Sequence, residues 1–401
     1  MDLSTLRSKF EQLSLSVYGK PLVYLDNAAT SLRPKGELET YVRDAVQFNA
    51  NLHRAVHFIA SEATSRYEST RQAVSRYFNA FCPEEIIFTS GTTASINLVA
   101  FSLGELLVGP GDKILVGDDS HHSNILPWQM LCERKGASLM HFDPLEPVEK
   151  HISSRTKIVA VAHISNVLGI VNPVKEIVAA CHRKGIPVLV DGAQGVVHQK
   201  VDFKELDCDF YAFSGHKMYA LPGTGVLYGK KEWLEKMPPY MGGGEMIGSV
   251  GWEKSTYAPL PQKFEAGTQN FTGTYSFLPA LELLSEMRCP EIEKEQAEII
   301  ETVENGLRTE IEGATLHGGF DRPGRVPLFS ITVDGVHHED LALILDKMGI
   351  AVRSGQMCAE PLMDKCGVTG MLRASFAPYN TVGEAKAFIN GLKKAVKMLR
   401  K

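Results

Sequence analysis

The stretch DFYAFSGHK, residues 209–217, joins a run of apolar residues to a polar turn that ends in a lysine. Its first five residues are rich in aromatic side chains, which is typical of a buried strand. Four other stretches have the same form: EIIFT (85–89), KILV (113–116), KIVAVA (157–162) and IPVLV (186–190). The sequence therefore predicts five buried strands, each followed by polar residues.

Segments with helical spacing lie between these strands. ASINLVAFSL follows Thr93, and VKEIVAACHRKG follows Pro173 and ends at Gly185, a residue type that often stops a helix. Strands that alternate with helices are typical of an α/β fold with a doubly wound, mostly parallel sheet. Ligands of such sheets bind beyond the carboxyl ends of the strands, so we expect the functional residues in the loops that follow them.

The C-terminal third has a different pattern, in which short strands alternate with longer helices. The expected strands are 326–333, 350–353 and 371–376, and the expected helices are 339–348 and 382–399. This pattern predicts a smaller α+β domain. We place the large domain at residues 16–288 and form the small domain from residues 1–15 together with 289–401.

Composition excludes several classes of function. The 401 residues are 44% hydrophobic, which suits a large core and not a small disulfide-stapled scaffold. The net charge is −5, with both signs spread along the chain, so neither nucleic acid nor a membrane is expected as a partner. No apolar stretch nears about 18 residues and residues 1–20 lack a signal-peptide core, which predicts a cytoplasmic protein. Seven cysteines without a C-x-x-C pair predict neither a disulfide framework nor a metal site.

Polar residues that could carry chemistry follow the predicted strands. They are SGTT (90–93), DDSHHSN (118–124), HISN (163–166), DGAQ (191–194) and SGHK (214–217). One such loop alone could be a solvated turn, but five at one sheet edge favour a site. SGTT stands between a strand and a helix, where free N–H groups favour a phosphate. It lacks the spacing of a Walker A loop, and a simple threonine N-cap remains the alternative.

Lys217 ends an apolar strand, close to this phosphate site and to an acid on a neighbouring strand. Together these are the parts of a pyridoxal phosphate site, which needs a Schiff base, an anion site and a partner for the pyridinium nitrogen. Asp191 is the candidate partner, because a carboxylate there would keep the ring nitrogen protonated. A solvated surface lysine and a turn aspartate remain the simpler interpretations of these two residues.

The motifs resemble the class V aminotransferase family, and most closely its group II (Suf-type) cysteine desulfurases, a branch that includes selenocysteine lyases and cysteine sulfinate desulfinases. The resemblance covers about residues 24–380. It rests on ten segments in this order: YLDNAAT, SGTTASINLVA, HHSNILPW, HISNVLG, VDGAQG, DFYAFSGHKMY, GTGVLYG, FEAGTQN, RSGQMCAEPL and LRASFAPYN. It implies the fold-type I pyridoxal 5'-phosphate architecture and a homodimer with each active site near the subunit interface.

Residue by residue, the resemblance implies that Lys217 is the Schiff-base lysine and Asp191 the pyridine-nitrogen partner. Gln194 would hydrogen-bond the phenolic oxygen of the cofactor, and His121 would stack on the ring and serve as an acid or base. The other implied site residues are Thr92, Thr93, Ser214, His216 and, from the other subunit, Thr268 for the phosphate, and His53, Asn166, Arg353 and Arg373 for the substrate.

Cys358 is the implied nucleophile, whereas the other six cysteines are expected to be inert. The implied reaction converts L-cysteine to L-alanine and leaves a persulfide on Cys358, whose sulfur goes to iron–sulfur cluster assembly. Selenocysteine or cysteine sulfinate could also be cleaved. Twenty positions separate Arg353 from Arg373, a short loop as in group II, which predicts a small acceptor protein that docks beside Cys358. Met357 stands where many relatives have a second histidine.

Two alternatives stay open from the sequence. One is a different reaction on the same cofactor, such as a transaminase or a kynureninase-type lyase, with Cys358 incidental. The other is a silent binding subunit of a sulfur-transfer complex. The presence of Lys217, Asp191, Gln194 and Cys358 argues against a silent subunit.

Overall fold

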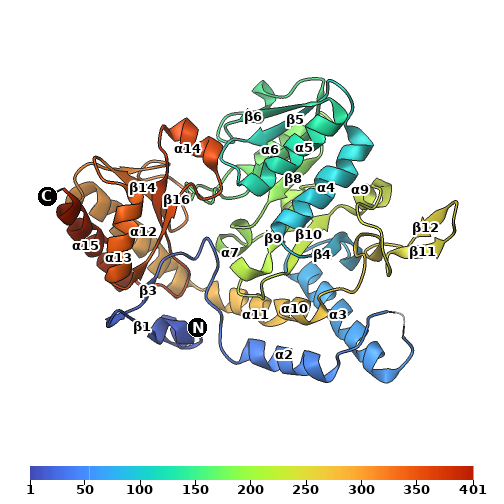
Figure 1. Ribbon diagram of the computed structural model, residues 1–401, viewed down its shortest axis with the longest axis horizontal. Helices are drawn as coiled ribbons and strands as arrows, with labels where there is room; N and C mark the ends of the chain where they lie inside the picture. The colour runs from blue at the N-terminus through green and yellow to red at the C-terminus, as the bar shows by residue number, and fades with distance from the viewer. Residues whose placement is uncertain (54, 401) are drawn as a thin grey trace. The chain divides into compact units, whose positions relative to one another are not determined.

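The computed structural model describes residues 1–53 and 55–400. The chain divides into two compact units, each built from more than one stretch of sequence (Figure 1). The large unit comprises residues 37–163 and 172–282, and the small unit comprises residues 1–36, 164–171 and 283–401. This division differs from the expected one. The small unit also contains residues 16–36 and the segment 164–171, and its C-terminal part begins at Leu283.

A seven-stranded sheet forms the centre of the large unit. Its order is β4 (Ile86–Thr89), β10 (Gly225–Gly229), β9 (Phe210–Ser214), β8 (Val188–Asp191), β7 (Thr156–Ala162), β5 (Lys113–Gly117) and β6 (Ser138–Phe142). β10 is antiparallel to both of its neighbours, and all other pairs are parallel. The five predicted strands are confirmed as β4, β5, β7, β8 and β9, and so is the mostly parallel sheet.

Helices cover this sheet, and α4 and α5 lie over one of its faces (Figure 1). The predicted helices after Thr93 and Pro173 are confirmed as α4 and α6. The helices of the large unit are α2 (Glu37–Gln47), α3 (Phe58–Tyr77), α4 (Thr92–Leu107), α5 (Leu126–Lys135), α6 (Val174–His182), α7 (Gly195–His198), α8 (Phe203–Leu206), α9 (Lys231–Lys236) and α10 (Phe271–Tyr275). α11 (Phe277–Met287) continues past its end, and β11 (Ile247–Val250) and β12 (Ser255–Tyr257) form a hairpin.

The core of the large unit explains why these elements form. Val99 and Leu103 of α4 pack with Trp128 of α5 against the buried strand residues Ile114 and Leu189. Burial of such side chains stabilises a fold by about 1.5–3 kcal/mol each. The inner strands are apolar on both faces because helices cover both sides of the sheet there, whereas the edge strand β6 is mostly exposed. The polar residues of the chain therefore gather beyond the strand ends.

The small unit is an α+β structure, as the sequence predicts. Its antiparallel sheet has the order β13 (Ala314–Leu316), β14 (Leu328–Val333), β17 (Met371–Ser375) and β16 (Arg353–Gly355). A separate parallel pair joins β15 (Ile350–Ala351) to β3 (Val23–Tyr24), and β1 (Ser16–Val17) pairs with β2 (Lys20–Pro21). The helices are α1 (Leu3–Ser8), α12 (Pro290–Glu310), α13 (His338–Lys347), α14 (Glu360–Cys366) and α15 (Val382–Leu399).

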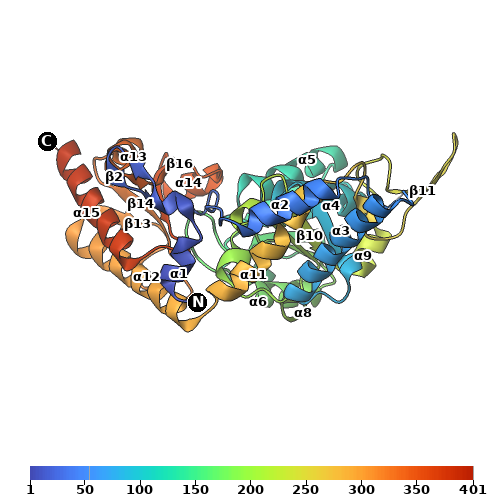
Figure 2. The same cartoon turned by 90° about the horizontal axis from the view of Figure 1, so that it is seen from below.

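Two long helices of the small unit, α12 and α15, pack side by side (Figure 2). Gly306 permits the close approach, because a Cβ there would lie 2.7 Å from the side chain of Ile389. α15 has the bounds that the sequence predicts. It begins with a capping box, in which Thr381 and Glu384 each accept a hydrogen bond from the backbone N–H of the other.

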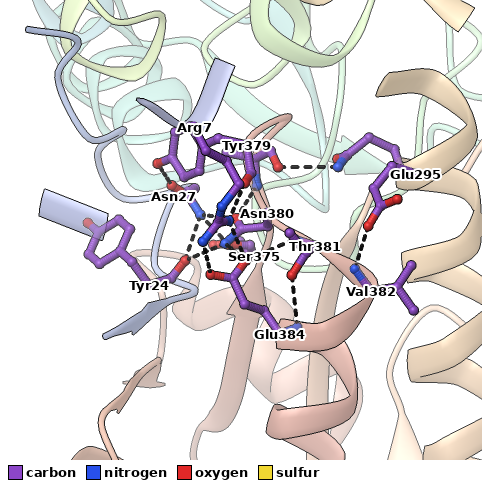
Figure 3. A network of polar contacts seen from close by, with 12 residues as sticks. Arg7, Tyr24, Asn27, Glu295, Ser375, Tyr379, Asn380, Thr381, Val382 and Glu384 are labelled. Atoms are coloured by element: carbon purple, nitrogen blue, oxygen red, sulfur yellow. Dashed lines mark hydrogen bonds and ion pairs between the residues drawn. The ribbon is translucent and has the colours of Figure 1, made fainter. Parts of the chain in front are cut away.

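A polar network ties the N-terminal segment to the start of α15 (Figure 3). Arg7 donates to both carboxylate oxygens of Glu384 at 3.0 Å and to the carbonyl of Tyr379 at 2.5 Å. Asn27 donates to the carbonyl of Ser375 at 2.8 Å and to Oδ1 of Asn380 at 3.2 Å. These bonds explain why residues 1–36 belong to a unit whose remaining residues lie far along the chain.

Within residues 1–53 and 55–400, no helix is both long and apolar enough to cross a membrane. Over the same residues, no group of three or more His, Cys, Asp or Glu side chains could hold a metal ion.

Candidate active site

Hydroxyl groups gather where β4 and β9 of the large unit end. Ser214, the last residue of β9, accepts a hydrogen bond from the backbone N–H of Thr92 at 2.8 Å, and its Oγ lies 2.7 Å from Oγ1 of Thr92. Thr93 is exposed, and its Oγ1 lies 2.7 Å from Oγ of Ser123. Thr92 begins α4, so the free N–H groups of a helix start lie among these hydroxyls. The arrangement suits an anion.

Two glycines keep this end of the sheet close-packed. Gly91 precedes α4 with a φ of 149°, a backbone conformation that other residues rarely adopt. A Cβ on Gly225, the first residue of β10, would lie 2.4 Å from Cα of Gly91. Backbone therefore meets backbone here, and only glycine fits at residue 225.

Asp191 and Lys217 lie at the ends of the neighbouring parallel strands β8 and β9. Asp191 is buried and accepts a hydrogen bond from the backbone N–H of Ala193 at 3.0 Å. Burial raises the pKa of its carboxyl, and this hydrogen bond and the charge of Lys217 offset part of the rise. Lys217 is half-buried in a 3₁₀ turn, Gly215–Lys217, directly after β9. The expected pairing of an acid and a lysine at one sheet edge is present.

A histidine and a tyrosine support the loop after β8. Nδ1 of His163 lies 2.8 Å from the hydroxyl of Tyr211, and both side chains are buried. Burial lowers the pKa of His163 to about 4, so the imidazole is neutral at pH 7. A Cβ on Gly192 would lie 1.8 Å from the Tyr211 ring, and one on Gly195 would lie 2.6 Å from Nδ1 of His163. The loop that carries Asp191 and Gln194 therefore lies directly on this pair.

The other predicted residues of the large unit have different surroundings. Nδ1 of His121 accepts a hydrogen bond from the backbone N–H of Ser123 at 3.0 Å. Gln194 is buried at the start of α7, whereas Thr268 is exposed in the loop before α10. His216 precedes Lys217 in the same turn and is half-buried.

His53 lies on a separate network of the large unit. Its Nε2 lies 3.0 Å from Oε1 of Glu68, and its backbone has a φ of 63°. Burial alone would raise the pKa of Glu68, but the hydrogen bond with His53 and the charge of Arg71 lower it to about 2. Arg71 in turn forms a buried ion pair with Glu265 at 2.7 Å. The ring of His53 is thus oriented by an ionised carboxylate.

In the small unit, one carboxylate joins the two predicted substrate arginines. Asp26 accepts from Nη2 of Arg353 at 3.0 Å and from Nη2 of Arg373 at 3.3 Å. The two arginines are paired across β16 and β17. Arg373 also donates through Nη1 to the carbonyl of Asn166 at 2.8 Å. Burial lowers the pKa of Arg373 to about 10, although Asp26 opposes this shift.

One nitrogen of the Arg373 guanidinium, Nε, makes no hydrogen bond with the described residues. The side chain of Arg373 is only 3% exposed, and this nitrogen is buried. A buried, unpaired guanidinium donor is costly, so this atom suits an anion such as a carboxylate. Arg353 differs, because its side chain is 46% exposed and its Nε and Nη2 are both directed at Asp26.

Cys358 lies on a left-handed turn of the small unit between β16 and α14. Its side chain is exposed, while Met357 before it and Ala359 after it are buried. Met357 and Cys358 have φ values of 54° and 53°, a conformation that costs about 1–2 kcal/mol for each residue with a Cβ. Asn166 donates through Nδ2 to the carbonyl of Met357 at 2.9 Å. An exposed thiol on a strained turn is typical of a functional residue.

Comparison with known proteins identifies the family. The model of the family described as "Aminotransferase class-V" matches residues 23–388. The chain belongs to the class V aminotransferase family. A probable cysteine desulfurase of Halalkalibacterium halodurans is 46% identical over 98% of both chains, and a cysteine desulfurase of Cronobacter sakazakii is 42% identical over 97% of both. The crystal structure of the cysteine desulfurase CsdA from Escherichia coli matches with a TM-score of 0.87 and 37% identity over 99% of both chains.

The cofactor of class V aminotransferases is pyridoxal 5'-phosphate, and the residues of the large unit fit it. The start of α4 offers free N–H groups and hydroxyls to a phosphate. Asp191 is buried, and burial opposes the ionisation of its carboxyl. A cationic ring nitrogen beside it would offset the free-energy cost of burying the charged carboxylate. Lys217 supplies an amine at the same sheet edge. The donor set therefore matches an anionic, aromatic aldehyde with a basic ring nitrogen.

Several residues of this class V aminotransferase site were not predicted from the sequence. Asp26, His163, Tyr211, Ser123 and Glu68 all hold a predicted site residue or the loop that carries one. Asp26 and Ser123 stand inside the motifs YLDNAAT and HHSN, so their positions were a usable signal. Tyr211 and His163 likewise stand inside the motifs DFYAFSGHKMY and HISNVLG, whereas Glu68 stands in none of the ten motifs and had no such signal.

Proposed function

We propose that this protein is a pyridoxal phosphate-dependent cysteine desulfurase of group II. It converts L-cysteine to L-alanine and takes the sulfur as a persulfide on Cys358. The observation that carries the proposal is the exposed thiol of Cys358, held on a left-handed turn between two buried neighbours. Pyridoxal phosphate chemistry alone does not require such a thiol. The relatives at 46% and 42% identity, a probable cysteine desulfurase and a cysteine desulfurase, support the same activity.

The cofactor would be held by residues of the large unit. Thr92, Thr93, Ser214 and His216 would bind its phosphate, Asp191 its ring nitrogen, Gln194 its phenolic oxygen and His121 the face of its ring. Lys217 would bind it covalently through Nζ. Once bound, the cofactor acts as an electron sink that stabilises negative charge at the substrate Cα.

The side chains of the chain itself would carry the remaining steps. Arg373 and Asn166 would bind the substrate carboxylate, through the unpaired Nε of Arg373 and the amide of Asn166. His53 and Arg353 complete the proposed substrate residues. Lys217 would move the Cα proton, because an amine that is not protonated is a competent base. His121 would supply or remove a proton in the later steps.

The sulfur transfer balances without an added oxidant. The thiolate of Cys358 attacks Sγ of the substrate, a new S–S bond forms, and the Cβ–Sγ bond of the substrate breaks. The electron pair of that bond ends on Cβ, which takes up a proton, and Lys217 would return a proton to Cα, which gives alanine. The thiol of Cys358 becomes a persulfide in the same step.

We further propose a homodimer in the cytoplasm and a small acceptor protein. The β11–β12 hairpin projects from the rest of the large unit (Figure 2). Val250, Trp252 and Tyr257 of this hairpin are all exposed, and exposed apolar side chains that lie together suit a subunit contact. In the dimer, Thr268 of one subunit would reach the phosphate of the other. The acceptor would take sulfur from Cys358 for iron–sulfur cluster assembly, since the loop between Arg353 and Arg373 is short. Sedimentation velocity tests the dimer, and faster turnover with an added acceptor tests the second partner.

The activity is tested by incubating the holoenzyme with L-cysteine and a reductant and measuring alanine and sulfide together. We expect equal amounts of both. Cys358→Ala should abolish sulfide release and leave the cofactor absorbance unchanged. Cys366→Ala, a change of the half-buried cysteine at the end of α14, is the matched control and should retain activity. Full activity of Cys358→Ala, or a keto acid in place of alanine, would contradict the proposal.

Selenocysteine and cysteine sulfinate are the proposed additional substrates. Selenium leaves carbon more readily than sulfur does, so Cys358→Ala should retain more activity on selenocysteine than on cysteine. Measuring alanine from each of the three substrates with both forms of the protein ranks these preferences.

A further inference from the structure

The backbone around Cys358 adopts a conformation that its own residues disfavour. Gly355, Met357 and Cys358 all have positive φ values, of 112°, 54° and 53°. Glycine accepts such values freely, but a residue with a Cβ does not. Contacts elsewhere in the small unit must therefore hold Met357 and Cys358 in this turn.

The side chain of Met357 provides the first of these contacts. It is 7% exposed and packs in a cluster with Val167, Leu362, Met363 and Met371. This cluster joins three parts of the small unit, namely the segment 164–171, α14 and β17. An unbranched, flexible methionine fills such an irregular space well. Because Met357 is anchored, the next side chain, that of Cys358, is directed outward.

Asn166 provides the second contact. Its side-chain Nδ2 donates to the carbonyl of Met357 at 2.9 Å, and its backbone carbonyl accepts from Nη1 of Arg373 at 2.8 Å. The amide nitrogen of an asparagine carries two hydrogens, so one bond to Met357 leaves the other hydrogen for a further acceptor. Asn166 therefore connects the two, through its side chain to the turn of the nucleophile and through its backbone carbonyl to Arg373, a residue proposed for the substrate carboxylate.

We propose that Met357 and Asn166 are positioning residues that hold the thiol of Cys358 in the orientation that sulfur transfer requires. We call these two residues together the Met357 anchor. The inference rests on the proposed function and extends it. Met357 acts through Cys358 and does not itself touch the substrate. Asn166 takes part both in the anchor and in the proposed binding of the substrate carboxylate, through the two hydrogens of its amide nitrogen.

The anchor makes a specific prediction about rates. In Met357→Ala the side chain no longer fills the cluster, and the strained turn relaxes. Transfer of sulfur to Cys358 in a single turnover should slow by at least tenfold, because a misplaced nucleophile loses much of its rate. The KM for cysteine should change less than twofold, since the carboxylate-binding side chains are intact. Met357→Leu, which conserves volume, should recover at least a third of the rate.

The matched control is Met363→Ala. It removes the same type of side chain from the same cluster, but at a position inside α14. If Met357 matters only for packing, both alanine variants should slow sulfur transfer equally, and that result would overturn the proposal. If Met357 is the anchor, Met363→Ala should retain the wild-type rate within about threefold.

Hydrogen exchange of the holoenzyme measures the turn without relying on turnover. The N–H of Ala359 donates to the carbonyl of Gln356 at 3.0 Å, and that of Leu362 donates to the carbonyl of Ala359 at 3.0 Å. Exchange at these two amides should accelerate at least tenfold in Met357→Ala and less than threefold in Met363→Ala. Should the amide of Ala359 exchange in the unaltered protein as fast as in a free peptide, the proposal is wrong whatever the variants do.

The turnover and hydrogen-exchange measurements distinguish a failure of the proposed function from a failure of the anchor proposal. If the unaltered enzyme releases no alanine and sulfide, the proposed function fails, while the exchange rates still report whether the anchor exists. Asn166→Asp removes both amide hydrogens and should raise the KM for cysteine as well as the exchange rates. A raised KM with unchanged exchange would show that Asn166 does not hold the turn.

Discussion

The strand-end cradle of the large unit and the Cys358 turn of the small unit show two ways of presenting reactive groups. The cradle is the set of hydroxyls and N–H groups at Thr92, Thr93 and Ser214, and it follows from regular elements that end side by side. The Cys358 turn has disfavoured φ values and is held by the Met357 side chain and by Asn166. The cradle is therefore placed by the order of the strands in the sheet. The Cys358 turn depends on tertiary contacts between residues up to 191 positions apart.

This difference predicts how each site responds to substitution. The cradle should tolerate the loss of single hydroxyls but not a shift of its backbone, since the backbone sets the spacing of its strand ends. The turn should tolerate changes of exposed side chains but not the loss of a buried contact. Three further predictions test this contrast.

The largest effect is expected from Gly225→Ala in the cradle. The new Cβ would lie 2.4 Å from Cα of Gly91, so the backbone at the start of α4 must move. We expect a loss of about 3 kcal/mol in the free energy of unfolding, the upper part of the usual range for overpacking. Cofactor affinity should also fall by at least tenfold, measured by titrating the apoprotein with pyridoxal phosphate.

Gly242→Ala is the control for this change, because no heavy atom lies within 4 Å of a Cβ built there. It should alter neither stability nor cofactor affinity. Equal affinities of Gly225→Ala and Gly242→Ala for the cofactor would show that the cradle does not depend on its backbone spacing.

An intermediate effect is expected when the pH is lowered, because protonation of His163 should reduce the free energy of unfolding. The pKa of His163 is about 4 in the folded chain, below the unfolded value of about 6.5. Its contribution to stability is therefore complete above pH 6.5 and is lost as the pH falls toward 4. From pH 7.5 to pH 5 the loss should be roughly 2 kcal/mol.

Chemical unfolding at the two pH values measures this loss. His163→Gln cannot titrate in this range, so its stability should fall by roughly 2 kcal/mol less than that of the unaltered protein between the same pH values. Parallel losses in the two proteins would mean that His163 is not buried in the neutral form.

The smallest effect is expected from Arg353→Gln beside the Cys358 turn. The Arg353 side chain is 46% exposed, so its pair with Asp26 should contribute less than about 1 kcal/mol. Arg373→Gln removes the buried partner of the same carboxylate, so it should cost more than Arg353→Gln and less than Gly225→Ala. Unfolding of the two variants under identical conditions compares them, and a larger loss for Arg353→Gln would show that burial does not decide which of the two ion pairs stabilises the fold more.

The sequence predicts the buried strands well because apolar, β-branched and aromatic runs leave few other options. It does not predict β6, whose residues Ser138–Phe142 are mostly exposed at the sheet edge and therefore lack an apolar pattern. It also does not predict β10 as a strand, because its five residues begin and end with glycine. Element type follows from local pattern only where a segment is buried.

The site is predictable to a similar extent. Lys217, Asp191 and Cys358 stand out because their residue types are unusual at the ends of apolar runs. The anchoring role of Met357 cannot be predicted from the sequence, because a methionine in a polar loop gives no sign that it is buried against Val167 and Met371. The membership of residues 16–36 and 164–171 in the small unit is equally invisible, because it depends on long-range bonds such as that of Arg373 to Asn166.

The polar network of Figure 3 also has a consequence for the order of synthesis. Arg7 pairs with Glu384, which is 377 positions later in the chain. At about 5–20 residues per second, Arg7 leaves the ribosome roughly 20–75 s before its partner exists. Residues 1–36 must therefore wait while the sheet of the large unit is made. During that interval residues 1–36 lack their native partners and are open to a chaperone or a protease.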